Sequence, residues 1–123
     1  MKLSQIIEIV EGTLHGTHDY RDVEIKGGCG ADLMSDVLAS IQPDAVLLTG
    51  LCNPQVVRTA VMADVRAIIF VRGKQPTQET FELAEAEKIP LISSPYGMFE
   101  LCGRLFEAGL SSLERDVETQ IYD

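Results

Sequence analysis

The chain has 123 residues, 46% of them apolar, which suffices for one domain with a single hydrophobic core. Its formal net charge of −9 argues against nucleic acid and anionic membranes as partners, because both are bound through clustered Lys and Arg. No apolar run approaches the roughly 20 residues of a membrane-spanning helix, and the polar start at Lys2, Ser4 and Gln5 does not suit a secretory signal, so we expect a cytoplasmic protein.

The first third of the chain contains two helical patterns separated by a short strand. Apolar residues at positions i, i+3, i+4 and i+7 within residues 3–10 predict an amphipathic helix. A polar, turn-rich stretch follows, and residues 23–25 then alternate like a strand that runs into the glycine turn 27–30. Asp32 is predicted to cap a second helix, which carries its apolar side chains within residues 33–41.

The rest of the chain alternates apolar runs with helical stripes. The runs have no polar interruption, which is typical of strands covered on both faces. Strands are expected at 45–48, 67–71 and 89–92, and the helices after them are expected to begin at Asn53, Thr77 and Ser94-Pro95.

Alternation of strands and helices with short turns predicts right-handed crossovers and a mainly parallel sheet. We therefore predict a small three-layer α/β sandwich formed by a single domain over residues 1–110. The pattern fades after Leu110, and residues 111–123 are predicted to be a polar tail. Either a frayed helical end or a mobile terminus fits this composition.

A ligand site is expected at the carboxyl ends of the strands, because ligands of open α/β sheets collect there. The segments that converge at this edge bear glycines or hydroxyl groups, and each precedes the N-terminus of a helix, which favours an anion. The candidate residues are Gly28, Gly30, Thr49, Gly50, Arg72, Gly73, Ser93, Ser94 and Tyr96. Each also has a structural explanation, since glycines permit tight turns and Ser94 before Pro95 can cap a helix. Asp32 beside the first segment would repel a phosphate.

The motifs of several enzyme classes are missing, and we predict a protein without catalytic activity. The glycine turn is followed by no Gly-Lys-Ser/Thr, and it lacks the third glycine of a dinucleotide motif. No serine has an obvious His and Asp partner, because His15 and His18 share one early turn, where exposed loop histidines are expected. We expect neither a cofactor nor a metal.

The cysteines Cys29, Cys52 and Cys102 are too far apart in the chain for a paired metal-binding motif. Buried or half-buried thiols are the simpler interpretation. The alternative is a redox or cluster site shared by Cys29 and Cys52, which the predicted fold places near strand ends.

Three stretches of this sequence resemble the DRTGG domain family. They are the strand ending in Thr49-Gly50, the closing run from Ile89 through Ser93-Ser94-Pro95-Tyr96 to Glu100, and the early turn and helix at 28–37. This sequence differs from the family pattern mainly at the residues of the motif from which the family takes its name. The family's Asp-Arg pair is missing, and its place falls near Cys52-Asn53-Pro54. The family's Thr-Gly-Gly is replaced by Val71-Arg72-Gly73, which keeps one glycine. An Asp that is frequent in the family after the tyrosine is replaced by Gly97.

The resemblance implies a fold like the N-terminal domain of HPr kinase and a regulatory or associative role. Domains of this family occur beside CBS domains in pyrophosphatases, and dimerisation is common among them, so we expect a homodimer that binds an anionic ligand such as a nucleotide. Stand-alone copies accompany iron-hydrogenase gene sets. The alternative prediction is therefore an accessory or scaffold protein that acts by contact with a redox-enzyme partner.

Overall fold

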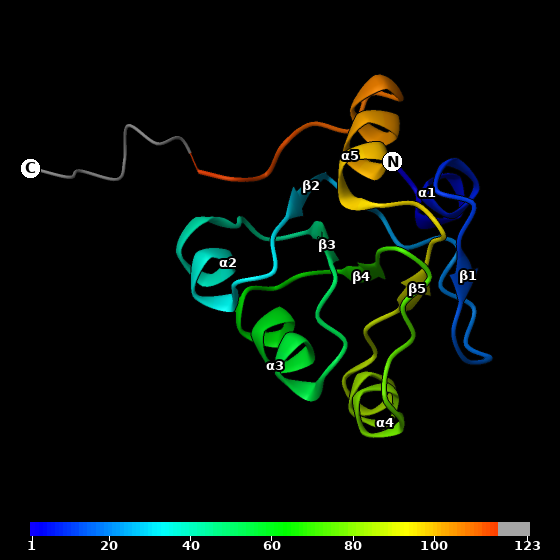
Figure 1. The fold of residues 1–123 in the computed structure, drawn as a ribbon, viewed down its shortest axis with the longest axis vertical. Coiled ribbons are helices and arrows are strands. Elements are labelled where there is room, and N and C mark those ends of the chain that lie inside the picture. Colours follow the sequence, from blue (N-terminus) through cyan, green and yellow to red (C-terminus); the bar gives the residue numbers. More distant parts are fainter. Residues whose placement is uncertain (116–123) are drawn as a thin grey trace, which may run out of the picture.

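A computed structural model describes residues 1–115 of the chain (Figure 1). Helices and strands alternate along most of this length, as the apolar pattern predicts. The elements are α1 (Leu3–Ile9), β1 (Thr13–Leu14), β2 (Gly27–Gly30), α2 (Met34–Ser40), β3 (Ala45–Thr49), α3 (Pro54–Met62), β4 (Ala67–Phe70), α4 (Gln78–Glu87), β5 (Leu91–Ser93) and α5 (Met98–Glu107).

The strands form one sheet in the order β1-β5-β4-β3-β2. Strands β2 to β5 are parallel neighbours in chain order, and β1 pairs antiparallel with β5. Helices α2, α3 and α4 cover one face of the sheet, and α1 and α5 cover the other (Figure 1). The predicted three-layer α/β sandwich with a mainly parallel sheet is confirmed.

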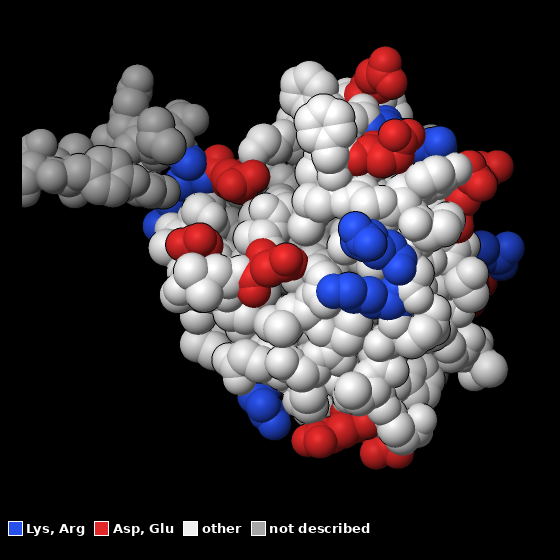
Figure 2. Space-filling model, in the orientation of Figure 1, with Lys and Arg blue, Asp and Glu red and all other residues white. Residues whose placement is uncertain are grey.

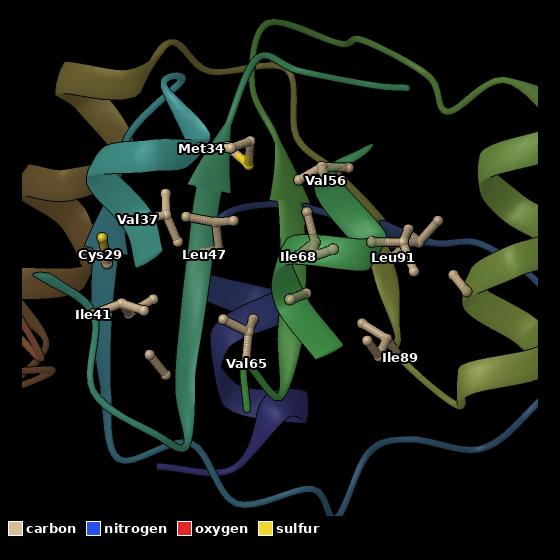
Figure 3. Close-up of a cluster of buried hydrophobic side chains, with 14 of the residues drawn as sticks. Cys29, Met34, Val37, Ile41, Leu47, Val56, Val65, Ile68, Ile89 and Leu91 are labelled. Atoms are coloured by element: carbon tan, nitrogen blue, oxygen red, sulfur yellow. The ribbon is translucent and has the colours of Figure 1, made fainter. Parts of the chain in front are cut away.

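The core consists of two apolar layers, one on each side of the sheet. Successive residues of a strand point to opposite faces, so Leu47 joins the layer under α2 to α4 while Leu48 joins the layer under α1 and α5. Figure 3 shows side chains of β3, β4 and β5 meeting those of α2 and α3. Each fully buried side chain such as Ile68 contributes about 1.5–3 kcal/mol to stability.

The strand predicted at 23–25 is wrong, because the glycines themselves form β2. Residues 23–25 keep only an isolated bridge between Lys2 and Glu24. Their alternation suggested a strand, but this stretch packs against α1 at the border of the sheet. The glycines are needed for close packing, since a Cβ on Gly27 would lie 2.5 Å from the carbonyl oxygen of Ser111.

The chain after α5 returns along the free edge of β2. The N–H of Gly28 donates to the carbonyl of Ser111 (2.9 Å), and the N–H of Leu113 donates to the carbonyl of Gly28 (3.0 Å). Residues 111–113 thus cover an edge that would otherwise be open for pairing. Glu114 and Arg115 bond to Ile41 and Ser40 at the end of α2 instead. The prediction for residues 116–123 lies outside the described residues, and the boundary at residue 110 stays a prediction.

The longest described helices, α4 and α5, have 10 residues each. Within residues 1–115, none of the helices combines the length and apolar character that crossing a bilayer requires.

Candidate functional site

The loops after β2, β3, β4 and β5 lie at one edge of the sheet, because these strands are parallel. We call this edge the rim, and it comprises residues 31–33, 50–53, 71–77 and 94–97. Of the predicted glycines, Gly50 and Gly73 lie in these loops and Gly30 is the last residue of β2. Gly28 lies inside β2, paired with Val46, so the expectation that it belongs to a turn is wrong.

Two backbone hydrogen bonds join the loop after β4 to the loop after β5. The N–H of Arg72 donates to the carbonyl of Tyr96, and the N–H of Gly73 donates to the carbonyl of Ser94, both at 2.7 Å. Arg72 and Gly73 both have left-handed backbone conformations, with φ of 58° and 68°. For an L-residue such as Arg72 this conformation costs about 1–2 kcal/mol, which the two cross-loop bonds help to offset.

Asp32 is a rim residue whose role differs from the predicted helix cap. Its carboxylate Oδ1 accepts from the hydroxyl of Thr49 (3.0 Å) and from the N–H of Gly50 (2.7 Å). The residue at the N-cap of α2 is Leu33, and no side chain caps this helix. Asp32 therefore places a negative charge at the end of β3. Its carboxylate occupies the Thr49 hydroxyl and the Gly50 N–H, which the sequence analysis proposed for an anionic ligand.

Lys74 extends over the same strand end. Its Nζ lies 3.3 Å from the carbonyl oxygen of Gly50, and a Cβ on Gly50 would lie 3.1 Å from this Nζ. The same Cβ would lie 3.6 Å from Oδ1 of Asp32. The absence of a side chain at Gly50 leaves room for both groups, which are more than 4.0 Å apart and form no ion pair.

Ser93 and His15 form a contact that the sequence does not reveal, because 78 positions separate them. Nε2 of His15 lies 2.7 Å from the hydroxyl oxygen of Ser93, whose proton goes to the carbonyl of Lys74 (2.6 Å). The imidazole must then be the donor to Ser93, which assigns the proton to Nε2. His15 is half-buried rather than exposed, and burial lowers the pKa of its imidazole.

The Ser93–His15 contact is structural rather than nucleophilic. A catalytic histidine must accept the serine proton, but the hydroxyl of Ser93 donates to a carbonyl and is buried. The contact holds β1 against β5 instead, next to the pairing of Leu14 with Ile92.

Ser94 anchors the chain before α5 instead of starting that helix. Its hydroxyl donates to the carbonyl of Val10 (2.8 Å) and accepts from the N–H of Tyr96 (3.2 Å). The N-cap of α5 is Gly97, so the helix start expected at Ser94-Pro95 is wrong by several residues. Pro95 keeps the preceding residue extended, which delays the helix.

Tyr96 is held on both sides by side chains of other elements. Its hydroxyl donates to the carboxylate of Glu11, and this hydrogen bond is the main reason that its pKa is raised. The guanidinium carbon of Arg104 lies 3.9 Å from the centre of the ring, in cation–π geometry. Tyr96 therefore fixes the loop after β5 to α5 and to the end of α1.

The rim carries two exposed cations, Arg72 and Lys74, as well as the exposed carboxylate of Asp32. Arg72 and Lys74 are exposed, and among the described residues no carboxylate lies within 4.0 Å of either cationic group. Figure 2 shows basic groups on the face where the loop after β4 lies, with uncharged surface below them and acidic groups to their left and above them. The Cβ position of Gly97, at the uncapped start of α5, is 3.9 Å from Cγ of Arg72.

Three of the cavities in the described part of the chain lie away from the centre of the rim, and they differ in size. The largest, of about 440 Å³, is lined by residues such as Asp44, Arg66 and Lys88 at the opposite edge of the sheet. One of about 190 Å³ lies between α3 and α4, and one of about 130 Å³ lies between α5 and β2. None of the three is lined by Thr49 or by Arg72.

The cysteines lie in three different environments. Cys29 is buried in β2, and burial raises the pKa of its thiol to about 12, helped by the charge of Glu114. Cys52 is half-buried and Cys102 is exposed on α5. Within residues 1–115, His, Cys, Asp and Glu side chains do not come together in a group of three that could hold a metal ion.

Fold and rim together define a class, namely small α/β domains with a parallel sheet and a candidate ligand surface at the carboxyl ends of the strands. Comparison with known families identifies the family within this class. The chain belongs to the DRTGG domain family, whose model matches residues 5–108. The family resemblance of the sequence is thereby confirmed.

A solved structure with the same fold comes from Clostridium perfringens. It contains the CBS and DRTGG domains of the regulatory region of a pyrophosphatase, complexed with the activator diadenosine tetraphosphate. The TM-score is 0.70 at 17% sequence identity, and the match covers 85% of this chain and 45% of that chain. The chain thus spans less than half of the structure it matches. No curated protein matches this sequence.

Proposed function

We propose that this domain is a non-catalytic regulatory module that senses an anionic small molecule, of the nucleotide or phosphate type, at the rim. The observation that carries the proposal is the exposed pair Arg72 and Lys74, which has no carboxylate partner among the described residues. In a chain with a net charge of −9, such a positive surface favours an anion. The start of α5 beside Arg72 adds N–H groups without a side-chain cap.

The solved structure from C. perfringens supports the choice of ligand class. Its DRTGG domain belongs to a regulatory region that binds diadenosine tetraphosphate, an anion with two nucleoside groups. Identity of 17% establishes the fold alone, so the ligand class comes to this chain as a hypothesis.

The bonding within the rim narrows the set of residues that contact the ligand. In this proposal Arg72 and Lys74 supply positive charge to the ligand, and the edge of the Tyr96 ring contacts it. The N–H of Gly50 is already used by Asp32, and that of Gly73 by the carbonyl of Ser94. The remaining predicted residues act as scaffold in this proposal: Thr49, Ser93 and Ser94 bond within the protein, Gly30 packs against Met98, and Gly28 bonds to Ser111.

Titration calorimetry tests the proposal with diadenosine tetraphosphate, adenosine monophosphate and inorganic phosphate as probes. We expect at least one probe to bind, and the double variant Arg72→Gln/Lys74→Gln to weaken that binding by at least about tenfold, because hydrogen bonds to charged groups are lost. Arg58→Gln is the matched control, since Arg58 is an exposed cation on α3, away from the rim. Absence of binding by all three probes, or equal weakening by the control, contradicts the proposal.

A second candidate function is that of an accessory protein for a redox enzyme, acting through protein contacts. The exposed Phe99 and Phe106 of α5 favour it, because monomeric surfaces rarely expose aromatic side chains together. A cluster held by Cys29 and Cys52 would be a part of this function. Iron and sulfide analysis of protein purified without oxygen tests the cluster, and a sample free of both contradicts it. The homodimer expected from the family resemblance remains a proposal.

A further inference from the structure

The edge of the sheet opposite to the rim contains the largest of the three cavities, of about 440 Å³. The cavity lies at the amino ends of β3, β4 and β5, where a turn precedes each strand. Its wall consists of residues 43–44, 64–66 and 88–89 from these turns, and of Ala60, Val61 and Glu87 from α3 and α4. Figure 3 shows Val65 and Ile89 of this wall toward the amino ends of the strands. Small-molecule sites have volumes of about 300–1,000 Å³, a range that includes this cavity.

The wall contains charged groups that do not pair with one another. Asp64, Glu87 and Lys88 have no opposite charge within 4.0 Å among residues 1–115. Asp44 differs, because it is paired with Arg66 at 2.9 Å. Arg66 makes this bond through Nε, which leaves its terminal N–H groups for a ligand. The cavity thus offers two carboxylates on the one hand, and an ammonium group and guanidinium N–H groups on the other.

Two helices end at the same cavity. Helix α3 ends at Met62 and α4 at Glu87, and neither has a basic residue in its last turn. The carbonyl groups at a helix C-terminus carry partial negative charge and favour a cation. The carboxylates of Asp64 and Glu87 add negative charge at these two ends. This side of the cavity therefore favours a positively charged group of a ligand.

The turns of the wall retain backbone conformations that are unfavourable for their residues. Asp44, Asp64 and Lys88 have φ of 71°, 56° and 59°, and they are three of the five described non-glycine residues with positive φ. Glycine adopts this conformation without strain. Strained residues concentrate at functional sites, where their side chains serve a purpose other than stability. A ligand that uses these side chains explains why the three positions are not glycine.

The cavity of about 190 Å³ between α3 and α4 adjoins the first one, because Val61 and Glu87 line both. Its remaining wall residues are Val57, Arg58, Met62 and Leu83, three of which are apolar. An apolar cavity of about 150 Å³ accommodates a benzene molecule. The second cavity therefore suits one branched or aromatic side chain next to the charged cavity.

We propose that the two cavities together bind a free α-amino acid with an apolar side chain. Asp64 and Glu87 hold its ammonium group at the helix ends, and Lys88 and the terminal N–H groups of Arg66 hold its carboxylate. Its side chain lies between α3 and α4. The ligand has both charges but no net charge, so the net charge of −9 on the chain does not repel it. This site is separate from the rim, and the inference does not rest on the proposed function.

Titration calorimetry of the full chain with leucine and phenylalanine tests the proposal. We expect at least one of them to bind, and to bind at least about tenfold more tightly than glycine, which lacks the apolar side chain. Analogues without one charge should bind at least about tenfold more weakly as well. These are isopentylamine and isocaproate for leucine, and phenethylamine and hydrocinnamate for phenylalanine. Failure of both amino acids to bind at millimolar concentration overturns the proposal, and so does equal binding of an analogue that lacks one charge.

Two variants of the wall test which side chains hold the ligand. Glu87→Gln and Lys88→Gln each remove one charge from an exposed side chain, and we expect each to weaken binding by at least about tenfold. Glu79→Gln is the matched control, because Glu79 is exposed at the other end of α4. Unchanged affinity in either wall variant, or an equal loss in the control, contradicts the proposal. Circular dichroism of each variant confirms that the helix content is retained.

Amide chemical shifts in NMR spectra of the full chain locate the bound amino acid independently of any substitution. We expect the largest changes at residues 43–45, 63–66 and 87–89, and smaller changes at the rim. Largest changes at the rim instead would show that the amino acid occupies the surface proposed for the anionic ligand, and the site at the opposite edge would then be refuted.

Discussion

At the scale of single residues, Asp32 contributes a negative charge to the rim and fixes the loop after β3. A lone carboxylate at a strand end would repel an anionic ligand, yet here it accepts two hydrogen bonds, from the hydroxyl of Thr49 and the N–H of Gly50. Arg72 and Lys74 place two exposed positive charges on the same rim, where Asp32 is also exposed. The rim thus has a carboxylate that fixes the loop after β3 and two exposed cations that can attract an anion.

Replacing Asp32 tests its role in holding this loop. Asp32→Ala leaves the Thr49 hydroxyl and the Gly50 N–H without their partner, and we expect a loss of about 1 kcal/mol in unfolding free energy. Asp32→Asn keeps an acceptor oxygen and should lose less. Urea denaturation measures both, with Asp36→Ala on the exposed side of α2 as the control. A loss in Asp36→Ala equal to that in Asp32→Ala would contradict this role.

At the scale of elements, the ends of the helices α3 and α4 are set by single residues at their caps. Helix α3 begins at an Asn53 cap followed by Pro54, and α4 begins at a Thr77 cap, both as their sequences indicate. Helix α4 ends at Lys88 in a left-handed conformation with φ of 59°. Glycine is the usual residue there, because it adopts this conformation without strain.

Lys88→Gly should therefore stabilise the domain. We expect a gain of up to about 1 kcal/mol in unfolding free energy, because the side chain no longer opposes the left-handed conformation. Lys88→Ala is the control, since it removes the same charge but keeps a Cβ and should give no such gain. The midpoint of urea denaturation measures both. A lower midpoint for Lys88→Gly than for Lys88→Ala would show that strain at this helix end is not significant.

At the scale of the whole molecule, the two ends of the described chain close the sheet. β1 covers the edge at β5, and residues 111–113 cover the edge at β2. Both closures are made by segments with few apolar residues, and both depend on hydrogen bonds to the sheet. The contact of His15 with Ser93 is the side-chain part of the first closure.

The pH dependence of stability should report on this closure. Burial lowers the pKa of His15 below its ordinary value of 6.5, so the unfolded chain takes up a proton more readily than the folded chain. The contribution of His15 is complete above pH 6.5, and it falls as the pH decreases through 6.5 toward the lower pKa of the folded state.

Urea denaturation of the wild type and of His15→Gln, between neutral pH and about pH 5, measures this effect. We expect the wild type to lose more unfolding free energy than the variant over this interval. His18→Gln is the control, because His18 is exposed beside Glu85. The interpretation is wrong if His15→Gln and the wild type show the same pH dependence.

The sequence by itself determined the α/β class, the parallel middle of the sheet and the family. Continuous apolar runs such as 45–49 specify strands buried on both faces, and periodic stripes specify the helices, because both patterns arise from local geometry. The starts of α3 and α4 were also predicted, since caps are local interactions.

Only the tertiary structure decided how distant residues meet at the rim and at the edges. Residues 27–30 form the strand β2 rather than a turn. His15 contacts Ser93, and Asp32 bonds to Thr49 of β3 rather than capping α2. Each of these depends on a contact between segments far apart in the chain, which local propensity does not encode. Glycines in particular look alike in sequence whether they permit a turn or, as at Gly27, make room for another segment, and the difference lies in what packs against them.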